Sequence, residues 1–176
     1  MSSIMSNIKI RKALPEDAAA LLAIYSPYVT GTAVSFEYDP PSVGEFRARI
    51  ESISEKYPYL AAEADGVIAG YAYAHAFHER AAYRRSAELS IYIDKAYHGL
   101  GIGRTLYTEL ARRLAGMGVA NLYAGIAVPR EPDDPYLSLD SLNFHRRMGF
   151  EEVARFHACG EKFGRLYDVV YAEKIL

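Results

Sequence analysis

The most chemically informative part of the sequence is a run of alternating glycines, Gly99, Gly101 and Gly103, between an apolar strand pattern and a helical pattern. Glycine adopts positive φ angles readily and lets a ligand approach the backbone amides closely. The first N–H groups of the following helix have no partner within the helix, and the helix dipole adds partial positive charge there. The segment therefore predicts a site for a phosphate or pyrophosphate, although a plain glycine-rich turn gives the same pattern.

Two common phosphate-binding loops do not fit this segment. A Walker loop needs Lys-Ser or Lys-Thr after its last glycine, and neither pair occurs in the chain. A dinucleotide fingerprint needs Gly-x-Gly-x-x-Gly near the amino end of a βαβ unit, whereas this chain has Gly-x-Gly-x-Gly in mid-sequence. A P-loop and a Rossmann site are therefore both disfavoured.

The glycine segment resembles the acyl-CoA loop of the GCN5-related N-acetyltransferases (GNAT), which is Arg/Gln-x-x-Gly-x-Gly/Ala after a strand with a catalytic carboxylate. His98 stands where the family has Arg or Gln. The resemblance implies an α/β fold with a central, mostly antiparallel sheet flanked by helices. It also implies that main-chain amides hold the pyrophosphate of acetyl-CoA. The residues expected at this cofactor are Ile91, Tyr92, Ile93, His98, Gly99, Leu100, Gly101, Ile102, Gly103, Arg104, Ser138 and Ser141.

The composition of the chain limits the classes of function. A length of 176 residues predicts a single domain over residues 1–176, with a core over about 8–174. The formal net charge of −2 disfavours nucleic acid as a partner, and Cys159, the single cysteine, excludes an internal disulfide. The first residues lack the features of a leader and no apolar run reaches membrane-spanning length, so we expect a cytoplasmic protein without a membrane partner. Fifteen tyrosines favour an aromatic pocket or an interface.

Hydrophobic periodicity predicts strands and helices in an order that also matches the GNAT fold. Asp65-Gly66 is a strong signal for a hairpin. Strands are expected over residues 8–13, 59–64, 67–76, 87–93, 121–128, 152–158 and 167–173. Helices are expected from Pro15, over 43–56, from the glycine loop to Gly116 or Gly118, and from a Ser138 cap to Arg147. Turns are expected over 28–41, over the proline-rich 129–135, and around Gly160 and Gly164.

Transfer of an acetyl group from a thioester to an amine needs a base, a polarised carbonyl and a proton for the thiolate. Glu88 is the candidate base, because it lies on the strand before the glycine loop and faces away from the apolar stripe. A solvated carboxylate paired with Arg84 or Arg85 is the alternative. His145 stands where many relatives have a proton-donating tyrosine, so it is the candidate acid, with ordinary packing as its alternative. A main-chain N–H near residues 91–93 is expected to polarise the carbonyl.

The run Arg80-Ala81-Ala82-Tyr83, together with Val34-Ser35-Phe36-Glu37 and the segment from Phe144 to Phe150, resembles the phosphinothricin acetyltransferase branch. That branch also acetylates methionine sulfoximine and methionine sulfone, and it is commonly homodimeric. The resemblance implies that Phe36, Glu37, Arg80 and Tyr83 border the acceptor pocket. Arg80 would hold an α-carboxylate through two parallel hydrogen bonds, while Phe36 and Tyr83 would wall the acceptor side chain.

The leading hypothesis is therefore an acetyl-CoA-dependent N-acetyltransferase that acts by direct transfer on a small amino-acid-like amine. Two alternatives remain open. An acetyltransferase for protein or peptide amino termini would need an open acceptor groove, and a non-catalytic acyl-CoA sensor would bind the cofactor without turnover. Glu88 favours catalysis over sensing. His75 and His78 have no second pair of suitable ligands, so no metal is expected.

Overall fold

A computed structural model describes residues 7–176, so residues 1–6 of the expected domain and of its amino-terminal segment lie outside the described residues. The strands are β1 (Ile8–Lys12), β2 (Tyr59–Ala64), β3 (Val67–Ala76), β4 (Ser86–Ile93), β5 (Asn121–Pro129), β6 (Glu151–Lys162) and β7 (Arg165–Ile175). The α-helices are α1 (Ala18–Gly31), α2 (Val43–Ser54), α3 (Ile102–Gly116) and α4 (Asp140–Arg147). Short 3₁₀ helices occur at η1 (Pro15–Asp17), η2 (Ala81–Tyr83) and η3 (Lys95–Tyr97).

The seven strands form one sheet in the order β1-β2-β3-β4-β5-β7-β6. Neighbouring strands run antiparallel except β4 and β5, which run parallel. The predicted mixed, mostly antiparallel sheet flanked by helices is confirmed. The predicted hairpin between β2 and β3 is also confirmed, with positive φ angles of 50° at Asp65 and 83° at Gly66. Among residues 7–176, no helix combines the length and apolar character needed to cross a membrane.

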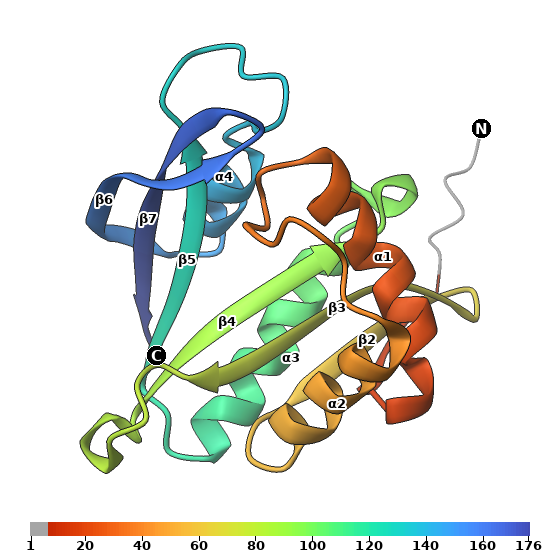
Figure 1. The fold of residues 1–176 in the computed structure, drawn as a ribbon. Coiled ribbons are helices and arrows are strands. Elements are labelled where there is room, and N and C mark those ends of the chain that lie inside the picture. The colour runs from red at the N-terminus through yellow and green to blue at the C-terminus, as the bar shows by residue number, and fades with distance from the viewer. Residues whose placement is uncertain (1–6) are drawn as a thin grey trace, which may run out of the picture.

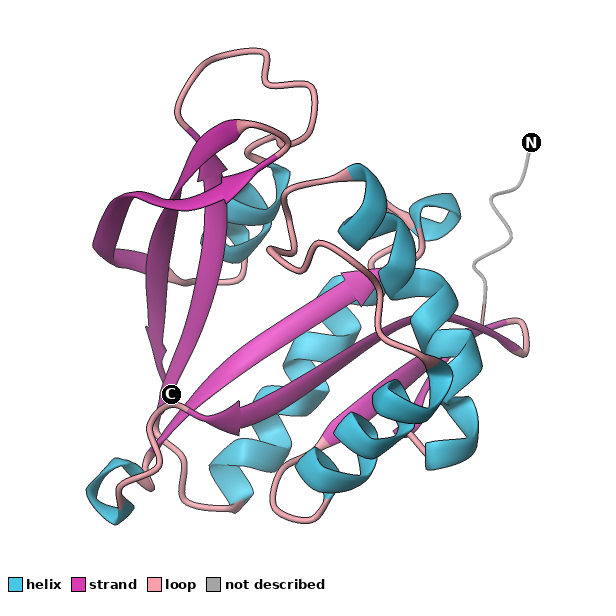
Figure 2. Ribbon diagram, in the orientation of Figure 1, coloured by secondary structure: helices cyan, strands magenta, loops and turns pink. Residues whose placement is uncertain are grey.

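Helices cover opposite faces of the sheet: α1 and α2 lie over β2 and β3 on one face, and α3 lies on the other (Figures 1 and 2). Side chains along β4 alternate between these two faces. Leu89 and Ile91 pack in the core on the α3 side, whereas Tyr92 packs in the core on the α1 and α2 side. Six tyrosines lie in or against that second core, so part of the tyrosine content serves packing. They are Tyr25, Tyr28, Tyr59, Tyr71, Tyr73 and Tyr92.

The sheet opens between β4 and β5. In the described residues their parallel ladder covers three residue pairs at the start of both strands, Ser86 with Asn121, Ala87 with Leu122, and Glu88 with Tyr123. Beyond Glu88 the two strands diverge, and the edge of β4 that faces β5 no longer pairs with it (Figure 1).

Helix α1 is longer than expected. Residues 28–31 were predicted to be turn, but the helix continues through Pro27 to Gly31. Proline in a helix removes one backbone hydrogen bond, and tertiary contacts compensate here. Val29 is fully buried, and the hydroxyl of Tyr28 donates to the carbonyl of Ile93 on β4.

Strand β6 also extends beyond its predicted end at residue 158. It continues to Lys162, and the turn falls at Phe163 and Gly164, with φ angles of 51° and 69°, rather than around Gly160. The pairing of β6 with β7 shifts register between Phe156 and Gly160. A bulge breaks the alternation of side chains, so periodicity does not reveal the second half of the strand.

Candidate active site

Gly99 and Gly101 form the turn into α3, with φ angles of 78° and 81°. Within the described residues, nothing lies within 4 Å of the place where a Cβ would sit on either glycine. Gly101 is the N-cap residue of α3, so the first free N–H groups of that helix follow it directly. An open backbone at a helix amino terminus is the geometry that a pyrophosphate fits.

The third glycine of the loop has a different role. A Cβ on Gly103 would lie 3.0 Å from Cε2 and 3.1 Å from Cζ of Phe144 on α4, so the missing side chain lets α3 and α4 pack closely. Ile102 is buried in the core, and only its main chain is available to a ligand. Leu100 and Arg104 are exposed beside the loop.

His98 ties the glycine loop to its surroundings. Its Nε2 lies 3.0 Å from Oη of Tyr28 on α1 and 3.2 Å from the carbonyl oxygen of Ile93 on β4. These contacts join the glycine loop to α1 and to the end of β4.

A cavity of about 60 Å³ lies at the opening between β4 and β5. The amide of Asp94 donates to the carbonyl of Ala69 on β3, and backbone groups alternate in direction along a strand. The N–H groups of Ile91 and Ile93 therefore point away from β3, toward the opening. The walls of the cavity are Val34, Leu89, Ser90, Ile91, Tyr92, Tyr107, Ala124, Gly125, Ile126, Ala127, Ser141 and His145.

Glu88 lies at the point where β4 and β5 separate, and it is half-buried. Oη of Tyr171 on β7 lies 3.4 Å from each of its carboxylate oxygens. Gly125 leaves space for the carboxylate, because a Cβ there would lie 3.3 Å from Oε1 of Glu88. Burial raises the pKa of Glu88, opposed by the charge on His75, the bond from Tyr171 and the charge on His78. A raised pKa suits a carboxylate that must take a proton near neutral pH.

Two of the neighbours of Glu88 were not predicted from the sequence. His75 of β3 stands directly opposite Glu88 in the β3–β4 register, and Tyr171 comes from β7. The alternative pairing of Glu88 with Arg84 or Arg85 is not present in the described part of the chain, where both arginines are exposed. Residues 7–176 also contain no group of three or more His, Cys, Asp or Glu side chains arranged to hold a metal ion.

His145 of α4 is buried and forms two hydrogen bonds. Its Nδ1 lies 2.7 Å from the carbonyl oxygen of Ser141, so Nδ1 carries a hydrogen. Its Nε2 lies 2.9 Å from Oη of Tyr107 on α3, and in the neutral ring this nitrogen accepts a hydrogen bond from the hydroxyl. Burial lowers the pKa of His145 and favours that neutral form. Tyr107, which the sequence analysis did not single out, is thus part of the cavity wall.

The two predicted cofactor serines on and before α4 differ in position. Ser141 lines the cavity and its carbonyl accepts from His145. Ser138 is exposed, and its hydroxyl accepts from the amide of Asp140, although Leu139 rather than Ser138 is the N-cap residue of α4. The predicted cap is therefore one residue too early.

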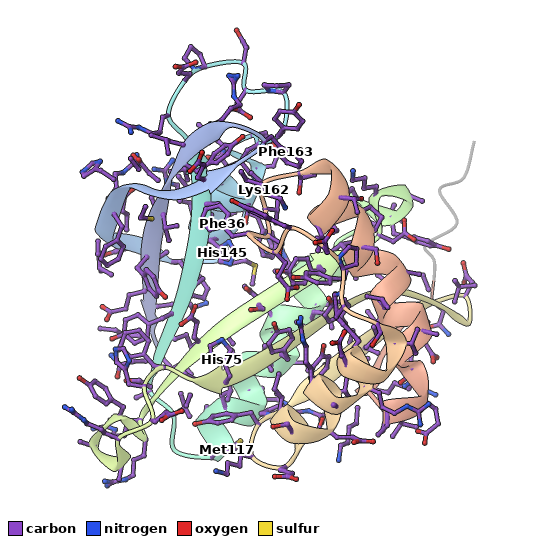
Figure 3. The ribbon with its side chains drawn as sticks, viewed as in Figure 1. Phe36, His75, Met117, His145, Lys162 and Phe163 are labelled. Carbon is purple, nitrogen blue, oxygen red and sulfur yellow. The ribbon has the colours of Figure 1, made fainter. Side chains whose placement is uncertain are left out.

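The predicted acceptor residues fall into two groups. Phe36 lies after α1, near Lys162 of β6 (Figure 3), and Glu37 follows it in the chain. Arg80 and Tyr83 lie in the exposed loop between β3 and β4, shown in light green at the lower left of Figure 1. Phe36 and Tyr83 therefore lie toward opposite ends of β4, and the structure does not bring these two described side chains together.

The two groups of predicted acceptor residues contact different parts of the fold. Glu37 accepts hydrogen bonds from Tyr25 and from both terminal nitrogens of Arg49, at 2.6 and 3.1 Å, and Arg49 lowers its pKa. The Tyr83 ring centroid lies 6.0 Å from that of Phe77, which lies 6.4 Å from that of Tyr171 beside Glu88. Glu37 is thus a structural partner of Arg49, whereas Tyr83 reaches Glu88 through two intervening rings.

Comparison with known proteins identifies the family. Residues 10–171 match the acetyltransferase (GNAT) domain. Phosphinothricin N-acetyltransferase of Alcaligenes faecalis is 38% identical over 95% of this chain and 82% of its own. The crystal structure of a GNAT phosphinothricin acetyltransferase from Sinorhizobium meliloti in complex with acetyl-CoA is 34% identical, with a TM-score of 0.85 over 96% of this chain and 88% of that one.

A second solved structure carries a different name. Ribosomal-protein-alanine N-acetyltransferase from Brucella melitensis is also 34% identical, with a TM-score of 0.86 over 96% of this chain and 99% of that one. The family match and the curated relatives named above nevertheless agree on the family. This chain belongs to the GNAT superfamily, as an acetyl-CoA-dependent N-acetyltransferase of the phosphinothricin and methionine sulfoximine acetyltransferase branch.

Proposed function

We propose that this enzyme acetylates the α-amino group of a small amino-acid-like acceptor, with phosphinothricin, methionine sulfoximine and methionine sulfone as the candidates. The observation that carries the proposal is the half-buried carboxylate of Glu88, whose Oε1 lies against Gly125 in the wall of the cavity between β4 and β5. This cavity is the place where the acetyl group and the attacking amine would meet. The named activities of the curated relatives supply the acceptor class.

The residues of the chain divide the work of direct transfer. The amides after Gly99 and Gly101 hold the pyrophosphate, and the free N–H groups of Ile91 and Ile93 polarise the thioester carbonyl. Acetyl-CoA, when bound, supplies the activated acetyl group. Glu88 takes a proton from the acceptor ammonium, directly or through a water, so that the amine can attack. Holding both reactants together lowers the barrier by roughly 7–11 kcal/mol in favourable cases.

The proton for the departing thiolate is assigned to the pair formed by Tyr107 and His145 rather than to His145 alone. Both side chains line the cavity, and they share a hydrogen bond of 2.9 Å. The neutral His145 has its Nδ1 hydrogen committed to Ser141, so it accepts rather than donates toward Tyr107. The hydroxyl of Tyr107 thus carries the only hydrogen between the two side chains. When the thioester C–S bond breaks, this hydrogen goes to the sulfur, and the proton that the attacking nitrogen loses as the amide forms restores the hydroxyl of Tyr107. His145 orients the hydroxyl.

An acceptor screen with thiol release as the readout tests this function. We expect turnover with methionine sulfoximine, methionine sulfone and phosphinothricin, and little with the parent amino acids or with peptides. The Brucella structure makes a peptide amino terminus the second candidate, so an alanine-terminated peptide belongs in the screen. Preference for the peptide would overturn the proposed acceptor class. Acetyl-CoA binding without turnover of any acceptor would instead indicate a sensor.

The expected homodimer remains a prediction. Val153 and Phe156 on β6, the strand at the sheet edge, are about half exposed, and a second copy would cover such side chains. Sedimentation of the wild type and of a Phe156→Lys variant tests it, and a monomeric wild type would contradict it.

A further inference from the structure

The most unusual buried charge outside the cavity belongs to Lys162, near the tip of the β6–β7 hairpin. Its side chain is 3% exposed, and its Nζ donates to three main-chain carbonyls. The distances are 2.7 Å to Val29, 2.8 Å to Thr32 and 2.6 Å to Ser35. A buried ammonium is costly unless its donors are satisfied, and here all three are.

These three carbonyls belong to the end of α1 and the segment that follows it. The carboxyl end of a helix leaves carbonyls without partners, and a lysine there is favourable. Lys162 supplies this cation from 127 to 133 positions away in the chain. The ammonium therefore fixes the exit of α1 and the path of residues 32–35 to the hairpin.

The same hairpin also contacts the two aromatic residues that follow Ser35, which are Phe36 and Tyr38. A Cβ on Gly160 would lie 2.3 Å from Cε2 and 2.4 Å from Cζ of Phe36, so the ring rests on the bare backbone of Gly160. The hydroxyl of Tyr38 donates to the carbonyl of Glu161 at 2.7 Å. The hairpin tip thus holds the segment by a buried ammonium, by ring packing and by a hydroxyl.

Residues 32–38, which the hairpin contacts, also extend to the candidate active site. Val34 lines the cavity between β4 and β5. Ser35 and Glu37 both hydrogen-bond to the hydroxyl of Tyr25, whose ring centroid lies 4.9 Å from that of Tyr92 on β4. A shift of the hairpin would therefore move one cavity wall and its supports together.

We propose that Lys162 and Gly160 are positioning residues that set the fit of the amino-acid acceptor, without taking part in cofactor binding. Lys162 fixes the main chain of residues 32–35, and Gly160 fixes the ring of Phe36. This inference rests on the proposed function, since it takes residues 34–37 as the acceptor-side wall. It predicts that the β6–β7 hairpin, rather than the glycine loop, limits the size of acceptor side chain that the enzyme accepts.

Gly160→Ala tests the packing half of the proposal. The added Cβ must displace the Phe36 ring, and a displacement of roughly 1 Å in a positioning element can lower catalytic efficiency by up to about 100-fold. We expect KM for methionine sulfoximine to rise about tenfold, with KM for acetyl-CoA within about twofold of wild type. Gly116→Ala is the matched control, because a Cβ there meets nothing within 4 Å among the described residues.

A double-mutant cycle identifies the contact. In a Phe36→Ala background the ring is gone, so Gly160→Ala should have almost no further effect on KM for the acceptor. An equal effect of Gly160→Ala in both backgrounds would overturn the assignment of its role to Phe36. An equal rise in KM for acceptor and for acetyl-CoA would overturn the claim that the hairpin acts on the acceptor alone.

Lys162→Met tests the ammonium, with Lys174→Met as its control. Lys174 of β7 also donates to a main-chain carbonyl, that of Met148 at 2.8 Å. It lies beside the end of α4 and does not contact residues 32–38. We expect Lys162→Met to raise KM for methionine sulfoximine and to admit acceptors with larger side chains, while Lys174→Met changes neither. Should Lys162→Met fail to fold by circular dichroism, Gly160→Ala and its cycle decide the question.

The wild-type enzyme separates the two possible failures. If the wild type does not acetylate methionine sulfoximine or any acceptor in the panel, the proposed function fails. If the wild type is active but the hairpin variants keep its KM and its acceptor profile, the positioning role fails while the proposed function stands.

Discussion

The two sides of β4 are built in different ways. The proposed cofactor side consists mainly of consecutive residues, 91–104, with main-chain amides at Ile91, Ile93 and the turn after Gly99 and Gly101. The proposed acceptor side combines Glu88 of β4, residues 34–37 after α1 and the β6–β7 hairpin. A donor common to the whole family needs only a backbone cradle, whereas an acceptor must be distinguished by side chains that distant segments bring together.

This contrast has a physical basis. Every residue except proline has a main-chain N–H. The amides that the loop presents therefore do not depend on exposed side chains such as Leu100 and Arg104. The acceptor wall depends on the Lys162 ammonium, on the Gly160 contact and on the Glu37–Arg49 pair, and each of these is a specific side-chain geometry. Changes on the two sides should therefore affect different kinetic constants.

Glu88→Gln should give the largest effect, because it removes the proposed base at the junction of the two sides. General-base catalysis contributes about 10²–10⁴-fold, so kcat should fall by at least about 100-fold near neutral pH. The dissociation constant for acetyl-CoA, measured by calorimetry, should stay within about twofold of wild type. Glu79→Gln, in the exposed loop before β4, is the matched control.

The pH dependence of the same variant sharpens this test. Burial raises the pKa of Glu88 above 4.5, so the charged base is lost as pH falls through that raised value. The wild-type profile of kcat/KM should fall on its acid side at a pH above 4.5, and this limb should disappear in Glu88→Gln. An identical profile in the variant would refute the base assignment. The raised pKa also means that ionised Glu88 opposes folding at neutral pH, so the variant should not be less stable there.

Gly101→Ala should weaken the binding of acetyl-CoA without changing the use of the acceptor. A residue with a Cβ at a φ of 81° is strained, at a cost of about 1–2 kcal/mol, and its methyl group narrows the cradle. We expect acetyl-CoA to bind about tenfold more weakly, with the acceptor profile unchanged. Gly66→Ala carries the same strain at a φ of 83° in the β2–β3 turn, so it should lower the melting temperature without changing acetyl-CoA binding. Equal losses of binding in both variants would show that strain alone, and not the cradle, explains the result.

His75→Asn should give the smallest effect and should act only on the base. The positive charge of protonated His75 lowers the pKa of the Glu88 carboxyl, with Tyr171 and His78 acting in the same direction. Removing that charge should move the acid limb of the kcat/KM profile to higher pH. Binding of acetyl-CoA should not change. A limb that stays in place would show that the charge on His75 does not set the pKa of Glu88.

The sequence predicted the backbone elements of the proposed cofactor side well. The strand, the glycine turn and the start of α3 are local features, and the β2–β3 hairpin follows from Asp65-Gly66 in the same way. The same reasoning treated three glycines as one cradle, although Gly103 packs on Phe144 of α4. The order of strands and helices was also predictable, while the end of α1 and the second half of β6 depended on tertiary contacts and on a bulge.

By itself, the sequence determined the order of strands and helices, the glycine turn at the start of α3 and the face of β4 that carries Glu88, because each follows from the types and spacing of neighbouring residues. Only the tertiary structure decided which residues share the site with Glu88. His75 reaches it through strand register, Tyr171 through the sheet order, and Lys162 acts on the acceptor wall from a distant hairpin. Such contacts arise when the chain closes long loops to bury its core, and no local pattern in the sequence records which distant residues then meet.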